Sequence, residues 1–103
     1  EEAGVEQVFT AKNIASTIKL AQARGAAIAA CASFRIAVQD YEPTLVKKTL
    51  VGTGRAEKEQ VAFMVARLLG KTHIEGPLDS TDALAIAVCH LTLRRFRRLE
   101  GKI

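Results

Sequence analysis

The sequence has few of the residues that stabilise small domains through cross-links or large aromatic rings. Its 103 residues include two cysteines, two prolines, one tyrosine, four phenylalanines and no tryptophan. Neither Cys31 nor Cys89 has a second Cys or a His at the spacing of a zinc knuckle, so we expect no structural zinc. Each cysteine lies in an apolar run, which favours buried free thiols in a reducing cytoplasm. The core must therefore be built from Ala, Val, Ile and Leu.

Long apolar runs are also absent. No stretch reaches the roughly 18 uninterrupted apolar residues of a membrane span, and no signal peptide is visible. We therefore expect a cytoplasmic protein that does not associate with a membrane. Hydrophobic residues nevertheless make up 49% of the sequence, which excludes intrinsic disorder. The length is that of one small compact domain.

Basic residues outnumber acidic ones by 15 to 11, which gives a formal net charge of +4. This balance permits nucleic-acid binding without proving it. The densest basic run, Arg94 to Arg98, lies at the end of the last predicted helix. It could follow a phosphate backbone, but we favour a solubilising helix end whose charges suit the helix dipole.

Hydrophobic patterning predicts a strand, a helix, a second strand and then three helices. The strands are expected at Val5 to Phe9, a β-prone run, and at Phe34 to Gln39, where apolar and polar residues alternate. The helices are expected at Asn13 to Ala32, Pro43 to Leu50, Arg55 to Leu69 and Ser80 to Arg98. Such an order belongs to the α/β class.

Helical spacing also predicts which faces are buried. The third helix is expected to bury the stripe Val61, Val65, Leu68 and Leu69. The last helix is apolar on nearly every face from Ala83 to Leu91, so we expect this half to be buried.

The helix from Asn13 to Ala32 is unusual in its small residues. Asn13 is suited to cap it, and its second half consists almost entirely of Ala, Gly and other small or apolar residues. Gly25 costs a helix about 1 kcal/mol relative to Ala, which suggests close packing. The close neighbour could be the sheet or a second copy of the helix in a dimer.

Three carboxylates lie at positions suited to chemistry. Asp79 and Asp82, spaced i, i+3 at the start of the last helix, would face the same side. Alternatively, Asp79 caps the helix and Asp82 is an acid favoured by the helix dipole. Glu6 lies in an apolar strand, where it either lines a site or faces water from an edge strand. Together, three such carboxylates could bind two Mg²⁺ ions and hold a phosphodiester.

A smaller basic set lies between the second and third predicted helices. Solvated surfaces account for most single Lys and Arg residues of this kind, so the set alone does not identify a binding site. The residues concerned are Lys47, Lys48, Arg55 and Lys58.

Four segments stand in order along the chain: VEQVF followed by AKN (residues 5–13), QARG (22–25), VKKT followed by VGTGRAEK (46–58), and DSTDALAIA (79–87). Together they resemble the RuvC-type Holliday-junction resolvases, which are crossover junction endodeoxyribonucleases. The resemblance covers nearly the whole chain and keeps the spacing between the motifs.

The resemblance implies an RNase H-like fold of the retroviral integrase superfamily. It also implies a homodimer, formed through the helix from Asn13 to Ala32, whose subunits each cut one of two opposed strands of a four-way DNA junction during recombination and repair. Hydrolysis in the family uses Mg²⁺ or Mn²⁺, two ions per site. A branch-migration helicase complex is implied as a further partner.

The resemblance also assigns roles to single residues. Three metal-binding catalytic carboxylates of the family match Glu6, Asp79 and Asp82, and a lysine implicated in DNA binding and catalysis matches Lys58. Two further DNA-contacting positions match Phe9, which would otherwise be read as a core residue, and Lys47. To this DNA-binding set we add Arg55, which opens the same predicted helix as Lys58.

One departure from the family affects the activity expected of the chain. The family begins with a strand carrying Gly-Ile-Asp-Pro-Gly-Ser or similar, whose Asp is a fourth carboxylate, and no such segment is present here. Residues 1–103 would then form a single, partial RNase H-like nuclease domain that alone cleaves DNA poorly or not at all. The alternative function is a truncated, catalytically inactive module that dimerises and binds DNA.

Overall fold

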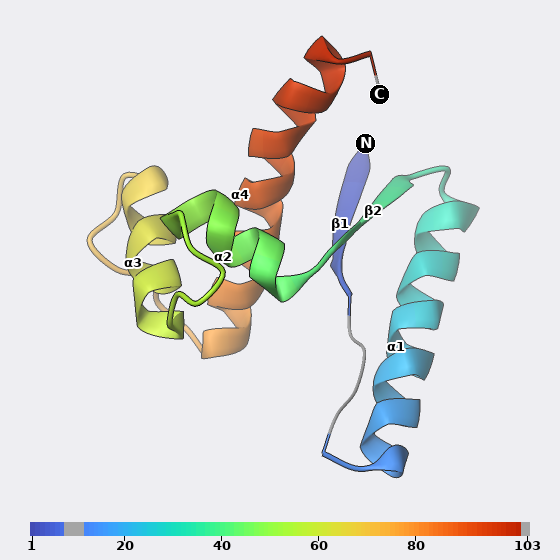
Figure 1. Ribbon diagram of the computed structural model, residues 1–103. Coiled ribbons are helices and arrows are strands. Elements are labelled where there is room, and N and C mark those ends of the chain that lie inside the picture. The colour runs from blue at the N-terminus through green and yellow to red at the C-terminus, as the bar shows by residue number, and fades with distance from the viewer. Residues whose placement is uncertain (8–11, 102–103) are drawn as a thin grey trace. The chain divides into compact units, whose positions relative to one another are not determined.

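The computed structural model describes residues 1–7 and 12–101, except the side chains of Leu78 and Asp79 (Figure 1). The chain divides into two compact units, residues 1–42 and residues 43–103. Within the described residues, no helix is both long enough and apolar enough to span a bilayer.

The first unit consists of a strand, a helix and a second strand: β1 (Glu2–Glu6), α1 (Ile14–Ser33) and β2 (Ala37–Tyr41). The strands pair in parallel, with Glu2 opposite Ala37 and Glu6 opposite Tyr41. A parallel pair needs a long crossover connection, which α1 supplies. The α/β class predicted from the sequence is confirmed.

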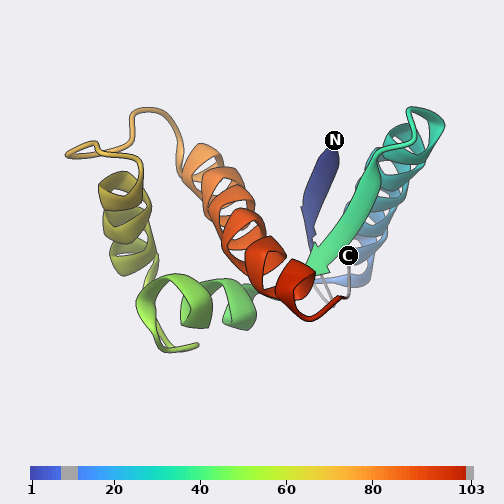
Figure 2. The ribbon, with the colours of Figure 1, turned by 90° about the horizontal axis from the view of Figure 1, so that it is seen from above.

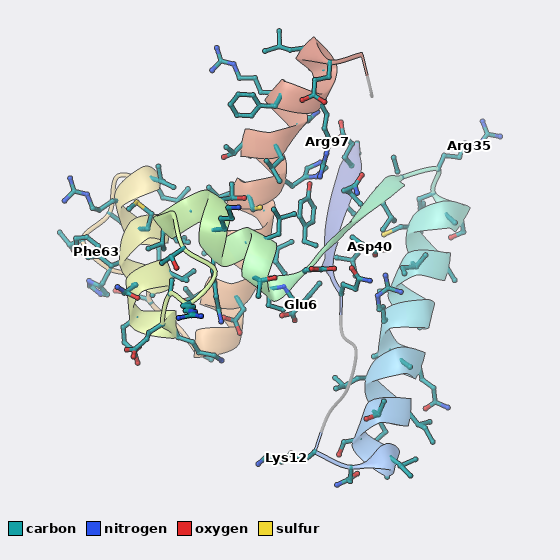
Figure 3. All side chains as sticks on the ribbon, viewed as in Figure 1. Glu6, Lys12, Arg35, Asp40, Phe63 and Arg97 are labelled. Carbon is teal, nitrogen blue, oxygen red and sulfur yellow. The ribbon has the colours of Figure 1, made fainter. Side chains whose placement is uncertain are left out.

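Helix α1 begins as the sequence predicts. Asn13 is its N-cap, and its Oδ1 accepts a hydrogen bond of 2.8 Å from the backbone N–H of Ser16. Further along the helix, Arg24 forms an ion pair with Asp40 of β2, which Figure 3 labels. This pair ties the helix to the strand that follows it.

The predicted strand from Phe34 to Gln39 is wrong in its bounds. Phe34 is the C-cap of α1, and Arg35 adopts a left-handed φ of 57° that no strand residue adopts. The backbone N–H of Ile36 still donates to the carbonyl of Cys31, at 2.8 Å. This helix-ending turn occupies the residues before Ala37, so the strand begins only there. The left-handed position of such a turn is usually taken by glycine, and here it is taken by Arg35.

The first strand also differs from its prediction. It was expected from Val5 to Phe9, but β1 ends at Glu6, and Phe9 lies outside the described residues. The N–H of Gln7 donates to the carbonyl of Tyr41 at 2.8 Å, which extends the pairing by one residue. Glu6 therefore lies at the end of the strand rather than in its middle.

The second unit consists of three helices, α2 (Pro43–Val51), α3 (Lys58–Leu68) and α4 (Leu78–Leu99), shown from two directions in Figures 1 and 2. Pro43 opens α2 as predicted. Gly70 ends α3 with a left-handed φ of 73°. Helix α3 starts three residues later than predicted because Glu57 is its N-cap, and the N–H of Glu57 donates to Gln60 Oε1 at 2.8 Å.

All three helices of this unit contribute side chains to a buried core. The apolar residues buried here are Val46, Leu50, Ala56, Val61, Val65, Ala66, Ala85 and Cys89. Burial raises the pKa of the Cys89 thiol, against smaller opposing effects from a hydrogen bond with Thr49 and the positive charge of Arg97. The thiol therefore stays protonated near neutral pH. Both cysteines are free, as predicted, although Cys31 is only half-buried.

Two predictions about burial in this unit are partly wrong. In α3, Val61 and Val65 are buried as expected, but Leu68 and Leu69 are exposed. In α4, the stretch from Ala83 to Leu91 is buried on one side only, through residues such as Ala85 and Cys89, while Leu91 is 62% exposed.

Candidate active site

The first predicted site residue, Glu6, ends β1 and is exposed (Figure 3). Among the described residues β1 pairs only with β2, so it is an edge strand there. The preceding residues, Ala3 to Val5, are half-buried. The end of the strand thus presents the Glu6 carboxylate to solvent, where a ligand can reach it.

The two aspartates lie on the first turns of α4. The N-cap of this helix is Pro77, so the alternative in which Asp79 caps the helix is wrong. Asp79 is the second residue of the helix and Asp82 the fifth, and residues spaced i, i+3 share one side of a helix. Of the two side chains, the structure describes that of Asp82. Acids here are favoured by the helix dipole, by about 0.3–1 kcal/mol.

Helix packing brings Asp82 close to Lys58, the first residue of α3. Lys58 Nζ lies 3.8 Å from Asp82 Oδ2, within ion-pair range but too far for a hydrogen bond. The two side chains are 63% and 46% exposed. An exposed pair contributes at most about 1 kcal/mol to folding, so a ligand can separate it at little cost.

The fold brings together two predicted site residues, Lys58 and Asp82, that lie 24 positions apart in the sequence. The Asp82 side chain is 46% exposed, so a ligand can reach its carboxylate. The sequence carried no signal for the pairing itself. It arises from the packing of α3 against α4, which periodicity alone does not specify.

Two other predicted DNA-binding residues lie on α2 and in the turn before α3. Lys47 is on α2 and half-buried, and Arg55 lies in the turn between α2 and α3 with its side chain exposed. The N–H of Arg55 donates to Thr53 Oγ1 at 3.2 Å, which fixes this turn. Phe9, the predicted aromatic contact, lies outside the described residues.

The predicted metal site combines residues from both units. Glu6 belongs to residues 1–42, whereas Asp79 and Asp82 belong to residues 43–103. Among the side chains that the structure describes, no group of three or more His, Cys, Asp or Glu residues could hold a metal ion. In chemistry the three residues do fit a hard cation, because carboxylate oxygens are the ligands that Mg²⁺ prefers.

Comparison with known proteins bears on this arrangement. The model of a family described as "Crossover junction endodeoxyribonuclease RuvC" matches residues 1–90, which include both β1 and the first turns of α4. The chain belongs to the RuvC family. The resemblance read from the four sequence motifs is therefore confirmed.

RuvC proteins of several bacteria are close in sequence. RuvC of Oleidesulfovibrio alaskensis is 66% identical over 101 residues, which cover 98% of this chain and 60% of that protein. RuvC of Lawsonia intracellularis is 57% identical over 102 residues, which cover 99% of this chain and 60% of that protein. The chain thus spans about 60% of the length of these curated relatives.

A solved RuvC structure is close in fold. Thermus thermophilus RuvC in complex with a Holliday junction substrate superposes with a TM-score of 0.80 at 35% identity, over 99% of this chain and 59% of that one. Together with the parallel strands and their helical crossover, this match confirms the RNase H-like fold predicted from the sequence.

Proposed function

We propose that this chain belongs to a crossover junction endodeoxyribonuclease, which hydrolyses phosphodiester bonds in opposed strands of four-way DNA junctions during recombination and repair. The observation that carries the proposal is the approach of Lys58 to Asp82 at the start of α4, within the segment that matches the RuvC family. Each residue was assigned to the site separately, and the fold brings them within ion-pair range.

The proposed site holds two divalent ions, Mg²⁺ or Mn²⁺, through the carboxylates of Glu6, Asp79 and Asp82. When bound, such ions supply charge neutralisation at the phosphodiester and activation of a water nucleophile. A site shared by β1 and α4 requires that both compact units belong to one nuclease domain spanning residues 1–103. Support comes from the donor types and from the exposure of Glu6 and Asp82.

Lys58 has a role of its own in this proposal. Its ammonium group lies beside the Asp82 carboxylate. In the proposed reaction, negative charge would develop here on the phosphate oxygens of the bound DNA. A fixed positive charge placed where charge develops lowers the barrier of phosphoryl chemistry. Because Lys58 is largely exposed, its ammonium group can turn from Asp82 to a phosphate oxygen without disturbing the core.

DNA is bound, in this proposal, by Lys47, Arg55 and Lys58 through phosphates and by Phe9 through bases at the junction centre. The three basic residues lie within twelve positions of one another on α2, α3 and the turn between them. Such contacts release counterions, so junction binding should weaken as salt rises.

The proposed assembly is a homodimer formed through α1, with one subunit for each of two opposed strands. None of the residues of α1 is buried, and the apolar side chains of Ile14 and Ile18 are exposed along it. Its small residues would let a second α1 approach closely. A branch-migration helicase complex is proposed as a further partner, and the free thiols of Cys31 and Cys89 are consistent with a reducing cytoplasm.

The competing proposal is a dimerising module that binds junctions without cutting them. The test compares cleavage of a labelled four-way junction, with and without Mg²⁺ or Mn²⁺, by the full-length protein and by residues 1–103 alone. We expect ion-dependent cleavage by the full-length protein and little or none by the 103 residues. Binding without cleavage by both would favour the non-cutting module, and robust cleavage by the 103 residues would refute the expectation that they are inactive alone.

A further inference from the structure

The ion pair between Lys58 and Asp82 joins two parts of the proposed site that bind ligands of opposite charge. Lys58 belongs to the proposed DNA-binding set, whereas Asp82 belongs to the proposed metal ligands. Lys58 Nζ lies 3.8 Å from Asp82 Oδ2, so the ammonium group lies close to any cation that this carboxylate would bind. A divalent ion on Asp82 and the charge of Lys58 would therefore repel each other.

The fold, rather than closeness in the sequence, makes Asp82 the partner of Lys58. Two acids, Glu57 and Glu59, flank Lys58 in the sequence. Among the described residues, however, the salt bridge of Lys58 is the one with Asp82. It forms because α3 packs against α4, two helices that can be followed in Figures 1 and 2. The acid paired with this lysine is thus a proposed metal ligand from another helix.

The backbone is held in place on both sides of the pair. At the start of α3, the N–H of Glu57 donates to Gln60 Oε1 at 2.8 Å, and Ala56 is buried. At the start of α4, Thr81 is buried. The two charged side chains are themselves exposed. The ends of both helices are therefore fixed, while the ammonium group can move on the flexible stem of the lysine.

We propose that Lys58 couples metal binding to DNA binding at this site. Before DNA binds, its ammonium group neutralises Asp82 and weakens the binding of a divalent ion there. When a DNA phosphate arrives, Lys58 turns to the phosphate oxygens and leaves the carboxylate to the ion. Each ligand then strengthens the binding of the other by the same factor, as thermodynamic linkage requires.

This inference rests on the proposed function, because it takes Asp82 as a metal ligand and Lys58 as a phosphate contact. Its consequence is that the site gains its metal mainly when DNA is bound. The expected effect is modest, since both side chains are exposed to solvent, which screens their charges. Removal of the ammonium group should strengthen metal binding without DNA by about fivefold.

The test measures Mn²⁺ binding by the full-length protein without DNA, from the electron paramagnetic resonance signal of free Mn²⁺. Lys58→Met removes the ammonium group and should lower the Mn²⁺ dissociation constant about fivefold. Lys58→Arg keeps the positive charge and should leave the constant close to that of wild type. Circular dichroism confirms that each variant folds.

Lys71→Met is the matched control for net charge. Lys71 is exposed and follows the end of α3, a helix of 11 residues that begins at Lys58. The two ends of this helix are about 15 Å apart. At about 0.1 M salt the screening length is about 10 Å, so the charge of Lys71 has little effect at Asp82. The Mn²⁺ dissociation constant of this control should equal that of wild type.

The second measurement repeats the titration with a saturating four-way junction that carries phosphorothioate linkages at its crossover. Denaturing gels confirm that the DNA is uncut at the end of each titration. Wild type should now bind Mn²⁺ as tightly as Lys58→Met does, because its ammonium group is paired with the DNA. The difference between the two proteins that is expected without DNA should therefore disappear.

Three results would overturn the coupling: equal Mn²⁺ affinity of wild type and Lys58→Met without DNA, an equal gain in Lys71→Met, or a difference that persists undiminished on the junction. Cleavage of an unmodified junction by wild type in Mn²⁺ distinguishes these results from failure of the proposed function. If wild type cleaves the junction and one of the three is found, Lys58 does not couple the two ligands. If wild type neither cleaves nor binds Mn²⁺, the proposed function is wrong and the coupling with it.

Discussion

The two compact units differ in how they bury apolar side chains. In residues 43–103, three helices contribute buried residues to a core, and Val65 and Cys89 are fully buried within it. In residues 1–42, the 20-residue helix α1 has no buried residue, and the sheet has two strands among the residues described. A two-stranded sheet is marginally stable alone and depends on packing against another element, such as a helix.

The difference shows what each unit contributes. The unit with its own core fixes the ends of α3 and α4, and with them Lys58 beside Asp82. In the other unit Tyr41 of β2 is buried, but α1 buries no residue and presents the surface that we propose for the dimer. In the proposed function, residues 43–103 would therefore position the catalytic groups and α1 would supply the area for association.

Outside the nuclease site, the largest expected effect concerns the dimer. Ile18→Asp in α1 should weaken self-association of the full-length protein by about 100-fold, because a charge would be buried in an apolar interface. Analytical ultracentrifugation over a range of concentrations measures this. Phe63→Asp is the matched control, since its side chain on α3 is 57% exposed against 52% for Ile18. Equal loss in both variants, or in neither, would remove α1 from the dimer interface.

The next effect concerns the core of residues 43–103. Val65→Ala should lower the free energy of unfolding by about 2 kcal/mol, because it removes two buried methyl groups and leaves a cavity. Leu68→Ala, one turn later on α3 but exposed, should cost less than about 1 kcal/mol. Urea denaturation followed by circular dichroism compares the two. A larger cost for Leu68→Ala would mean that Leu68 is buried in the folded protein, as the sequence predicted.

The smallest effect concerns DNA binding. Lys47→Ala should lower the slope of log affinity against log salt by about 0.9, the value for one lost phosphate contact on duplex DNA. Fluorescence anisotropy with a four-way junction at several salt concentrations gives this slope. Lys71→Ala, at an exposed position outside α1 and the proposed DNA-binding set, is the control and should leave the slope unchanged. If the slope of Lys47→Ala matches that of wild type, Lys47 makes no phosphate contact.

Features set by local chemistry could be predicted from the sequence. Asn13 caps α1, Pro43 opens α2 and Gly70 ends α3, because each depends on one residue's own backbone or side-chain preference. The α/β class and the family followed from patterning and from ordered motifs in the same way.

Features set by tertiary packing could not be predicted. Strand β2 begins later than predicted because Arg35 adopts a left-handed backbone conformation, which usually needs glycine. Leu68 is exposed because no helix of residues 43–103 covers that face of α3. The pair formed by Lys58 and Asp82 depends on how α3 packs on α4. Within the site, the sequence therefore identified residue types, while the fold decided which of them meet.

The most direct test of the proposed nuclease site is cleavage of a four-way junction by the full-length Asp82→Asn variant in Mg²⁺. We predict that the cleavage rate falls on the order of 100-fold or more while junction affinity is preserved, because a charged ligand is lost but no DNA contact. Glu59→Gln, the same carboxylate-to-amide change at an exposed position of α3, should cleave at the wild-type rate. A wild-type cleavage rate for Asp82→Asn would contradict the assignment of α4 to the active site.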